Sequence, residues 1–440
     1  MKSFFYLQII FVSIFIQCIN QEVFGQNSID NQIEYYTPYL KKLLSPPLPK
    51  PLPNISKDSE NINNILLVKG LVEVKEHSFW NAFWTLKKSY TSAYKNYLNN
   101  EKDTANTLVV GIIATTLDVI PSDYHWIRNL LGFTPPIDSP EELIKKGKKS
   151  SDSFLRFEAY TAELLLNAFI YKNQDKVNNL AKIYAQFYAQ YDVGKCVLAW
   201  SYFKNHEPEL AYFYVSNMSN KSTNWFGYRE YLSGSSAFYA QKNNLSKIHF
   251  YSYLNQYSSD YVKSIYYQLY LMSWFNTTDK NNLDALRKKI IDEGTLNLNV
   301  DKYAYTFAAK NTRNNKRIYH SRILFDGGQY EASIRTLIDI DSRNLNINDK
   351  LEYNYRFARS KHALKDTSLA IKYYLTVLEL AGDKPKEYYP ANSALNLGKL
   401  YESKGDMTNA EIYYNKAKSY PKHTYKNSID SEAKRRLNSL

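Results

Sequence analysis

One stretch near the C-terminal end, residues 391–421, restricts the fold more than any other part of the chain. It reads ANSALNLGKLYESKGDMTNAEIYYNKAKSYP. Apolar and small residues recur at three- and four-residue steps on both sides of Gly405-Asp406, a dipeptide that favours a turn. The pattern predicts two helices that fold back on each other as a hairpin, approaching closely at the small residues Gly398 and Ala410.

The hairpin has a defined order of residue types. If Ala391 is counted as position 1, positions 7, 8, 11, 20, 24 and 27 hold Leu397, Gly398, Tyr401, Ala410, Tyr414 and Ala417. Residues three or four apart are neighbours on a helix surface. Leu397 and Tyr401 therefore share one face of the first helix, and the last three residues share one face of the second.

The same order recurs upstream. Residues 351–381 place Phe357, Ala358, Ala370 and Tyr374 at positions 7, 8, 20 and 24, although position 11 is Lys361. A degenerate copy in residues 192–218 has Leu198, Ala199, Tyr202 and Ala211 at positions 7, 8, 11 and 20. A further turn is predicted at Gly327-Gly328, with Ala332 in the helix that follows.

These residues resemble the tetratricopeptide repeat (TPR), a helix–turn–helix unit of about 34 residues. Two features depart from its pattern: Ala394 stands where Trp is typical, and Pro421 comes one place early. One such unit cannot bury its own apolar face, so neighbouring units must stack. The resemblance, which we assign to a divergent, secreted bacterial type, implies an all-α fold, a TPR-like α-solenoid of stacked helical hairpins.

The rest of the chain also has helical periodicity. Only 14 of 440 residues are Gly, less than half of the roughly 7% that is usual, which disfavours turn-rich β architectures. We predict helices at 62–74, 79–98, 104–117, 153–171, 176–191, 194–203 and 207–218. The predicted organisation is a helical region at 56–185 followed by TPR-like repeats at 186–440.

The first residues have the layout of a secretory signal peptide. Lys2 precedes a short apolar run from Leu7 to Ile16, and small or modest residues stand before a predicted cleavage after Gly25. Residues 1–25 are therefore predicted to be removed, and the protein to reach the periplasm or cell envelope of a bacterium. Lipidation at Cys18 is the alternative, which fits less well because the three residues before Cys18 are bulky or polar.

Residues 26–55 follow as a predicted linker. Five of the 14 prolines lie between residues 45 and 54, which predicts an extended polyproline segment. No transmembrane span is predicted in the mature chain.

Recognisable catalytic or metal-binding motifs are missing from the sequence. The seven histidines include no H-E-x-x-H pair, and there is no G-x-S-x-G or G-x-x-x-x-G-K-[ST] motif. Lone Cys196 lies in an apolar helix, where a small core residue is the simpler interpretation. We therefore predict no catalytic residue, no cofactor and no metal, and a protein that is not an enzyme.

Charge and aromatic content suggest the class of partner. The formal net charge is +13, with basic clusters at 145–149, 287–289, 310–317 and 434–436. For an exported protein these clusters favour an anionic envelope surface or an acidic peptide over nucleic acid. The simpler interpretation of these clusters, which we favour over a dedicated site, is that they are solvated faces and helix C-terminal ends, where cations complement the helix dipole. The 41 tyrosines either fill the core or line a groove for peptides or sugars.

The sequence thus predicts a protein–protein interaction scaffold of the cell envelope whose partner is a protein or peptide. Two alternatives stay open. One is a module that binds envelope polysaccharide through Tyr and Lys/Arg, and the other is a hydrolase with an unrecognised site.

Overall fold

The computed structural model describes residues 63, 66–67, 69–70, 73, 79–100, 103–118, 133–219, 226–276, 280–310, 315–382 and 387–440. The predicted signal peptide at 1–25 and the linker at 26–55 lie outside these residues. The helices group into two compact units, which we describe separately. Unit 1 extends to Gln268 and includes Asp292–Ala304, and unit 2 comprises Leu269–Ile291 and Tyr305–Leu440.

All regular structure in the described residues is helical, which confirms the predicted all-α solenoid of helical hairpins. The helices up to residue 254 are α4 (Phe79–Asn99), α5 (Thr104–Asp118), α7 (Pro140–Lys148), α8 (Ser153–Leu166), α9 (Gln174–Tyr188), α10 (Asp192–Lys204), α11 (Pro208–Ser216), α12 (Phe226–Tyr239) and α13 (Asn243–Leu254). A π-helical turn, Asn167–Tyr171, extends α8. The helices predicted between residues 79 and 218 are confirmed to within three residues at each end.

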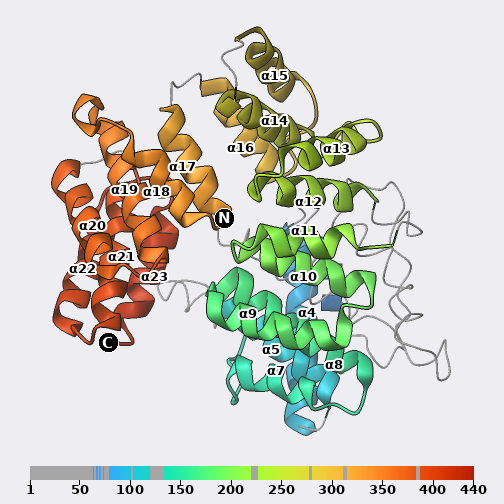
Figure 1. Cartoon of the computed structure of the whole chain (residues 1–440). Helices are drawn as coiled ribbons and strands as arrows, with labels where there is room; N and C mark the ends of the chain where they lie inside the picture. Colours follow the sequence, from blue (N-terminus) through green and yellow to red (C-terminus); the bar gives the residue numbers. More distant parts are fainter. Residues whose placement is uncertain are drawn as a thin grey trace. The chain divides into compact units, whose positions relative to one another are not determined.

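The remaining helices continue to the C-terminal end of the chain. They are α14 (Val262–Asn276), α15 (Lys280–Asp292), α16 (Asn299–Lys310), α17 (Lys316–Asp326), α18 (Tyr330–Ile338), α19 (Ile347–Ala363), α20 (Thr367–Ala381), α21 (Tyr389–Ser403), α22 (Met407–Ser419) and α23 (Lys426–Leu437). Within unit 2, Figure 1 shows α17 to α23 following one another as adjacent, packed helices.

Five hairpins of the described helices share one turn geometry: α10–α11, α12–α13, α17–α18, α19–α20 and α21–α22. In each turn one residue has a positive φ, and the next backbone N–H donates to the carbonyl five residues before it. The positive-φ residues are His206, Gln241, Gly328, Lys365 and Gly405. This bond closes the end of the first helix and turns the chain directly into the second.

The same hairpins bring two small residues together, twelve positions apart. The pairs are Ala199/Ala211, Gly234/Ser246, Ser321/Ser333, Ala358/Ala370 and Gly398/Ala410. Where the second residue is serine, its hydroxyl donates to the carbonyl of the first: Ser246 to Gly234 at 2.8 Å and Ser333 to Ser321 at 2.9 Å. Two helices can pack closely enough for such a hydrogen bond only where the side chains between them are small. The small pairs therefore set the distance between the two helices of each hairpin.

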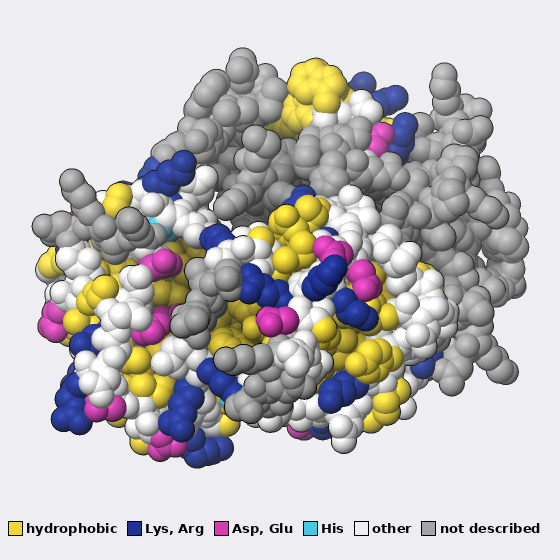
Figure 2. All heavy atoms as spheres, turned by 90° about the horizontal axis from the view of Figure 1, so that it is seen from above, with side chains coloured by type: hydrophobic (Ala, Val, Ile, Leu, Met, Phe, Trp, Pro, Cys, Tyr) yellow, Lys and Arg dark blue, Asp and Glu magenta, His cyan; other side chains and the backbone are white. Residues whose placement is uncertain are grey.

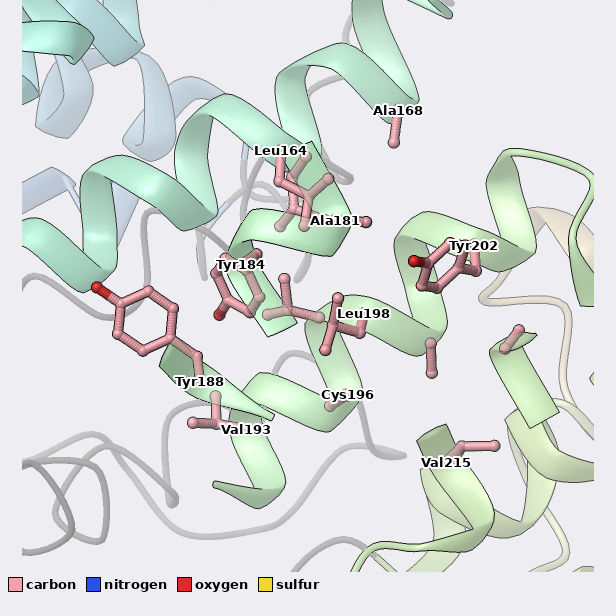
Figure 3. Packing of buried hydrophobic residues seen from close by; sticks show 14 of the residues in the cluster. Leu164, Ala168, Ala181, Tyr184, Tyr188, Val193, Cys196, Leu198, Tyr202 and Val215 are labelled. Atoms are coloured by element: carbon pink, nitrogen blue, oxygen red, sulfur yellow. The ribbon is translucent and has the colours of Figure 1, made fainter. Parts of the chain in front are cut away.

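Large side chains fill the space between the hairpins. In unit 1, Tyr184, Leu198 and Val215 belong to one buried cluster, to which α8, α9, α10 and α11 contribute (Figure 3). Fully buried tyrosines recur in both units and include Tyr90, Tyr97, Tyr184, Tyr253, Tyr355, Tyr374 and Tyr414. Many of the tyrosines thus serve packing.

None of the helices in the described part of the chain combines the length and the apolar character needed to cross a membrane.

Candidate partner-binding surface

The signature residues of the last two hairpins lie at the contacts between helices. Buried residues are Leu397, Gly398, Ala410, Tyr414, Ala417, Phe357, Ala358, Ala370 and Tyr374, whereas Tyr401 is half-buried. A Cβ atom at Gly398 would lie 2.5 Å from the Tyr414 ring, so this ring occupies the room that glycine leaves. The glycine and the tyrosine thus belong to one contact.

The signature residues of the α10–α11 hairpin are also buried at helix contacts, whereas in α18 the contact residue lies one place after the predicted one. Leu198, Ala199, Tyr202 and Ala211 are all buried. Gly327 ends α17, and Gly328 has a φ of 73°. Ala332 is half-buried, while its neighbour Ser333 is fully buried and lies 2.8 Å from the Ser321 hydroxyl. The small residue that touches the first helix is therefore Ser333, one place after the predicted Ala332.

A polar surface runs over the first helices of the unit 2 hairpins. Helix α17 packs on α19, α19 on α21, and α21 on the terminal helix α23. We call this surface the first-helix face. Its charged and polar side chains are Arg322, Glu352, Arg356, Arg359, His362, Asn392, Asn396, Lys399, Glu402, Glu432 and Arg436.

Most cations of the first-helix face have a carboxylate partner. Arg356 is 2% exposed and pairs with Glu352 at 2.7 Å, one helical turn away. Its guanidinium also lies 5.2 Å from the centre of the Tyr355 ring. This burial is tolerated because both the charge and the flat face of the guanidinium are matched.

Helix α23 completes the surface with a compact ion-pair network. Glu432 accepts from Lys399 at 3.2 Å and from Arg435 at 2.9 Å. Although burial alone would raise its pKa, these cations lower the pKa of Glu432 to about 2. Arg436 reaches Glu402 of α21 at 3.0 Å, which ties α23 to the stack.

Arg359 differs from the other cations of this face. Its guanidinium lies over the Phe325 ring at 4.0 Å and is 5.8 Å from the centre of the Tyr355 ring. Among the described residues, no carboxylate lies within ion-pairing distance of it. Arg359 is half-buried, and although burial opposes its charge, Tyr355 and Asp326 raise its pKa. Asp326 acts from beyond ion-pairing distance, so the guanidinium can still donate hydrogen bonds to an anion.

His362 is a titratable side chain that lies near two cations of this face. Burial, together with the nearby charges of Lys399 and Arg359, lowers the pKa of His362 to about 4. The imidazole is therefore neutral at physiological pH, with Nδ1 3.4 Å from the Tyr374 hydroxyl. Burial is the main cause, and the two cations add to it, so the charge of Arg359 is not joined by a second one on His362.

Two asparagines extend the polar surface on α21. The Tyr355 hydroxyl donates to Asn392 Oδ1 at 2.9 Å, and Asn396 Nδ2 donates to the same oxygen at 2.7 Å. Tyr355 is 37 positions from Asn392 in the sequence, and the two side chains meet because α19 and α21 pack together.

An arrangement similar to a catalytic triad occurs in unit 1. His249 Nδ1 lies 2.8 Å from Glu230, and His249 Nε2 lies 3.4 Å from the Tyr212 hydroxyl. Burial, with Glu230 nearby, raises the pKa of Tyr212, which is the opposite of what activates a nucleophile. The three side chains join α11, α12 and α13, and their geometry supports a structural bridge.

The thiol of Cys196 is a buried core group, and its environment does not favour reactivity. Cys196 is 1% exposed, and burial raises the pKa of its thiol to about 12. Within the described ranges, no group of His, Cys, Asp and Glu side chains is arranged to hold a metal ion.

On the face shown in Figure 2, Lys and Arg side chains lie singly or in small groups among hydrophobic and uncharged ones. The cluster at the end of α7 is compensated: Lys145 pairs with Glu142, Lys146 with Asp138 and Lys148 with Glu163. Of these pairs, the one between Lys148 and Glu163 ties α7 to another helix, α8.

Comparison with known families agrees with this architecture. The family model of the tetratricopeptide repeat matches residues 351–384 and 391–423, which cover α20 and α22 and most of α19 and α21. No protein with a curated description matches the chain. The matched segments are those that build the centre of the first-helix face. The chain is therefore a tetratricopeptide-repeat-containing protein.

Proposed function

We propose that the protein is a non-enzymatic scaffold of the bacterial cell envelope that binds an acidic segment of a protein partner on the first-helix face of unit 2. The matched repeats support this role, since tetratricopeptide repeats mediate binding of protein partners. The observation that carries the proposal is Arg359, a half-buried cation fixed by Phe325 that has no carboxylate partner among the described residues.

Recognition would follow from simple electrostatics. A glutamate or aspartate of the partner would accept hydrogen bonds from the Arg359 guanidinium, whose fork geometry suits a carboxylate. Partial burial lowers the effective dielectric, so this pair is worth more than an exposed ion pair. Asn392 Nδ2 could donate a hydrogen bond to a peptide backbone, and Asn396 Oδ1 could accept one, since the other amide atoms of the two residues are used in the bonds described above.

The test is a fluorescence-anisotropy titration with a labelled glutamate-rich peptide. We expect Arg359→Ala to weaken binding at least about tenfold, because a hydrogen bond to a charged group contributes about 1.5–3 kcal/mol. Arg359→Lys keeps the charge but not the fork, and should be intermediate. Arg335→Ala, which removes an exposed cation of α18, is the matched control.

Wild-type protein that binds a lysine-rich peptide equally well would contradict the proposal, as would Arg335→Ala weakening binding as much as Arg359→Ala. Thermal melts of each variant separate loss of binding from loss of folding.

The envelope location rests on the N-terminal sequence. The cation followed by an apolar run supports export and cleavage after Gly25. Mass spectrometry of the protein from its host should find Gln26 as the first residue. An N-terminus at Met1 in a cytoplasmic fraction would contradict the location without affecting the peptide-binding proposal.

A further inference from the structure

Helix α4 of unit 1 has one long exposed stripe. Its apolar members Trp80, Trp84 and Leu98 are 71%, 48% and 50% exposed. Lys88, Thr91 and Lys95 are exposed between them at three- and four-residue steps. The stripe therefore follows one side of the helix over about 27 Å, at 1.5 Å per residue. The opposite side is buried in the core through Ala82, Tyr90, Ala93 and Tyr97.

The two indoles form the apolar end of the stripe. Trp80 and Trp84 meet edge to face with their ring centroids 5.6 Å apart, and Trp80 stacks on Phe83 at 6.2 Å. Two adjacent tryptophans at such exposure are unusual, since large aromatic side chains normally bury most of their surface.

Lysines lie beside Trp84 at this aromatic end. Lys87 Nζ lies 5.2 Å from the centre of the Trp84 ring. A shallow depression of about 460 Å³ follows the helix, lined by Trp84, Lys87, Lys88, Thr91, Ser92 and Lys95. The indole and the ammonium groups are thus presented together on the same surface.

The charge of the stripe has a single sign. Residues 79–99 contain three lysines and no Asp or Glu. No carboxylate of the described residues pairs with these lysines, in contrast to the lysines of α7, which pair with Asp138, Glu142 and Glu163. The α4 lysines therefore keep their charge for an external anion.

We propose that the exposed stripe of α4 docks on a bilayer surface containing anionic phospholipid. Tryptophan rings settle at the level of the headgroups, where one edge of the indole is apolar and the N–H is hydrated. Lysines beside them reach the lipid phosphates, each contributing about 1 kcal/mol near an anionic surface. The helix would lie in the plane of the interface. A stripe of one charge sign suits an extended anionic surface better than a folded protein partner, because protein–protein interfaces are depleted of lysine.

The test is co-sedimentation of the full chain with vesicles of phosphatidylcholine alone or mixed with phosphatidylglycerol, at low and high salt. We expect binding to the mixed vesicles, a blue shift of tryptophan fluorescence, and weaker binding at high salt. The triple variant K87Q/K88Q/K95Q should bind about a hundredfold more weakly, and W80S/W84S should lose most of the blue shift.

The matched control is K182Q/K247Q/K372Q, which removes three exposed lysines from α9, α13 and α20 and changes the net charge equally. It should bind like the wild type. Equal loss in both triple variants would overturn the proposal, because binding would then follow net charge alone. Equal binding to both vesicle types, or binding of an acidic peptide to the stripe without binding of vesicles, would also overturn it. Circular dichroism verifies that each variant is folded.

Discussion

The α10–α11 hairpin of unit 1 and the α21–α22 hairpin of unit 2 have the same internal geometry but different surfaces. Ala199 and Ala211 occupy the places of Gly398 and Ala410. One residue beyond each small position of the first helix, unit 1 has Trp200, 5.3 Å from Phe169, where unit 2 has Lys399, paired with Glu432. The small residues hold the hairpin together, while the exposed side of the first helix is free to vary.

The position three residues further along the first helix gives the same contrast. Phe203 packs on Tyr239 at 5.6 Å in unit 1, whereas the equivalent Glu402 bonds to Arg436 in unit 2. One repeat frame thus supports an aromatic face in one unit and a charged face in the other. These outer positions are therefore where the proposed binding specificity would be encoded.

The largest expected effect tests whether a second hairpin of unit 1, α12–α13, shares one core position with the α21–α22 hairpin of unit 2. Tyr414 packs on Gly398 and Phe250 packs on Gly234, each with its ring 2.5 Å from the place of a glycine Cβ. Tyr414→Ala and Phe250→Ala should each lower the free energy of unfolding by about 3–5 kcal/mol, measured by urea denaturation. If only one of the two variants is destabilised, the equivalence of the hairpins is wrong.

A somewhat smaller effect is expected from overpacking the close approach. Ala410 and Ala211 are 0% exposed in equivalent places. Ala410→Leu and Ala211→Leu should each cost about 1–3 kcal/mol, because the neighbouring helix must move to admit the larger side chain. Ala332→Leu is the control, since Ala332 is half-buried and should tolerate the change better. Variants that melt like the parent would show that these sites are not close helix contacts.

The two units should respond to pH in opposite directions, beginning with Asp301 in unit 1. Burial raises the pKa of Asp301 to about 7, with Asp260 adding to the effect. The folded state then binds the proton more strongly than the unfolded state. The contribution of Asp301 to the free energy of unfolding is therefore fully present below about pH 4 and is lost as the pH rises through 7.

Comparing urea midpoints at pH 5 and pH 8 measures this effect, which is on the order of 2 kcal/mol. Asp301 accepts backbone N–H groups from Tyr261 at 2.8 Å and Ser264 at 2.9 Å. Asp301→Asn keeps one acceptor and should make stability less dependent on pH. An unchanged pH profile in that variant would show that another group titrates.

Glu432 in unit 2 should show the opposite sign. Its pKa is lowered to about 2, so its contribution is present above the ordinary glutamate pKa and is lost as the pH falls through 2. The effect should be smaller than that of Asp301, because the side chain is 28% exposed and solvent screens the network. Glu432→Gln should remove it in acid titrations followed by circular dichroism, whereas an identical acid transition would contradict the assignment.

The smallest effect concerns the turns. Lys365 has a φ of 62° at the place where the last hairpin has Gly405, with a φ of 78°. For a residue with a Cβ, this left-handed conformation destabilises the folded state by about 1 kcal/mol or more. We expect Gly405→Lys to lower stability by about 1 kcal/mol, and Lys365→Gly to raise it by up to about 0.5 kcal/mol because added chain entropy offsets part of the gain. Differential scanning calorimetry on both variants compares the two turns directly, and changes of the same sign would contradict the shared geometry.

The hairpin frame was predictable where its small residues were alanine or glycine. Gly398, Ala410, Ala358 and Ala370 are visible in the sequence because they interrupt runs of larger residues. The α12–α13 hairpin was harder to recognise because its second small residue is Ser246, whose hydroxyl finds the Gly234 carbonyl only when the helices are already packed. The sequence pattern that indicates this hairpin is any two of Gly, Ala and Ser at a spacing of twelve residues.

The candidate surface could not be predicted in the same way. Arg359 and Phe325 are 34 positions apart and meet because α17 packs on α19. Whether an arginine in a basic chain has a carboxylate partner depends on such packing. The exposure of Trp80 and Trp84 likewise depends on which side of α4 faces the core, and their aromatic character alone suggests burial.

The most direct test of the account is hydrogen–deuterium exchange with and without the glutamate-rich peptide. If unit 2 carries the binding face, the peptide should slow exchange in α19 and α21 and leave α10 to α13 unchanged. Protection centred on α10 to α13 would contradict the assignment of function to unit 2, and so would exchange that the peptide changes nowhere.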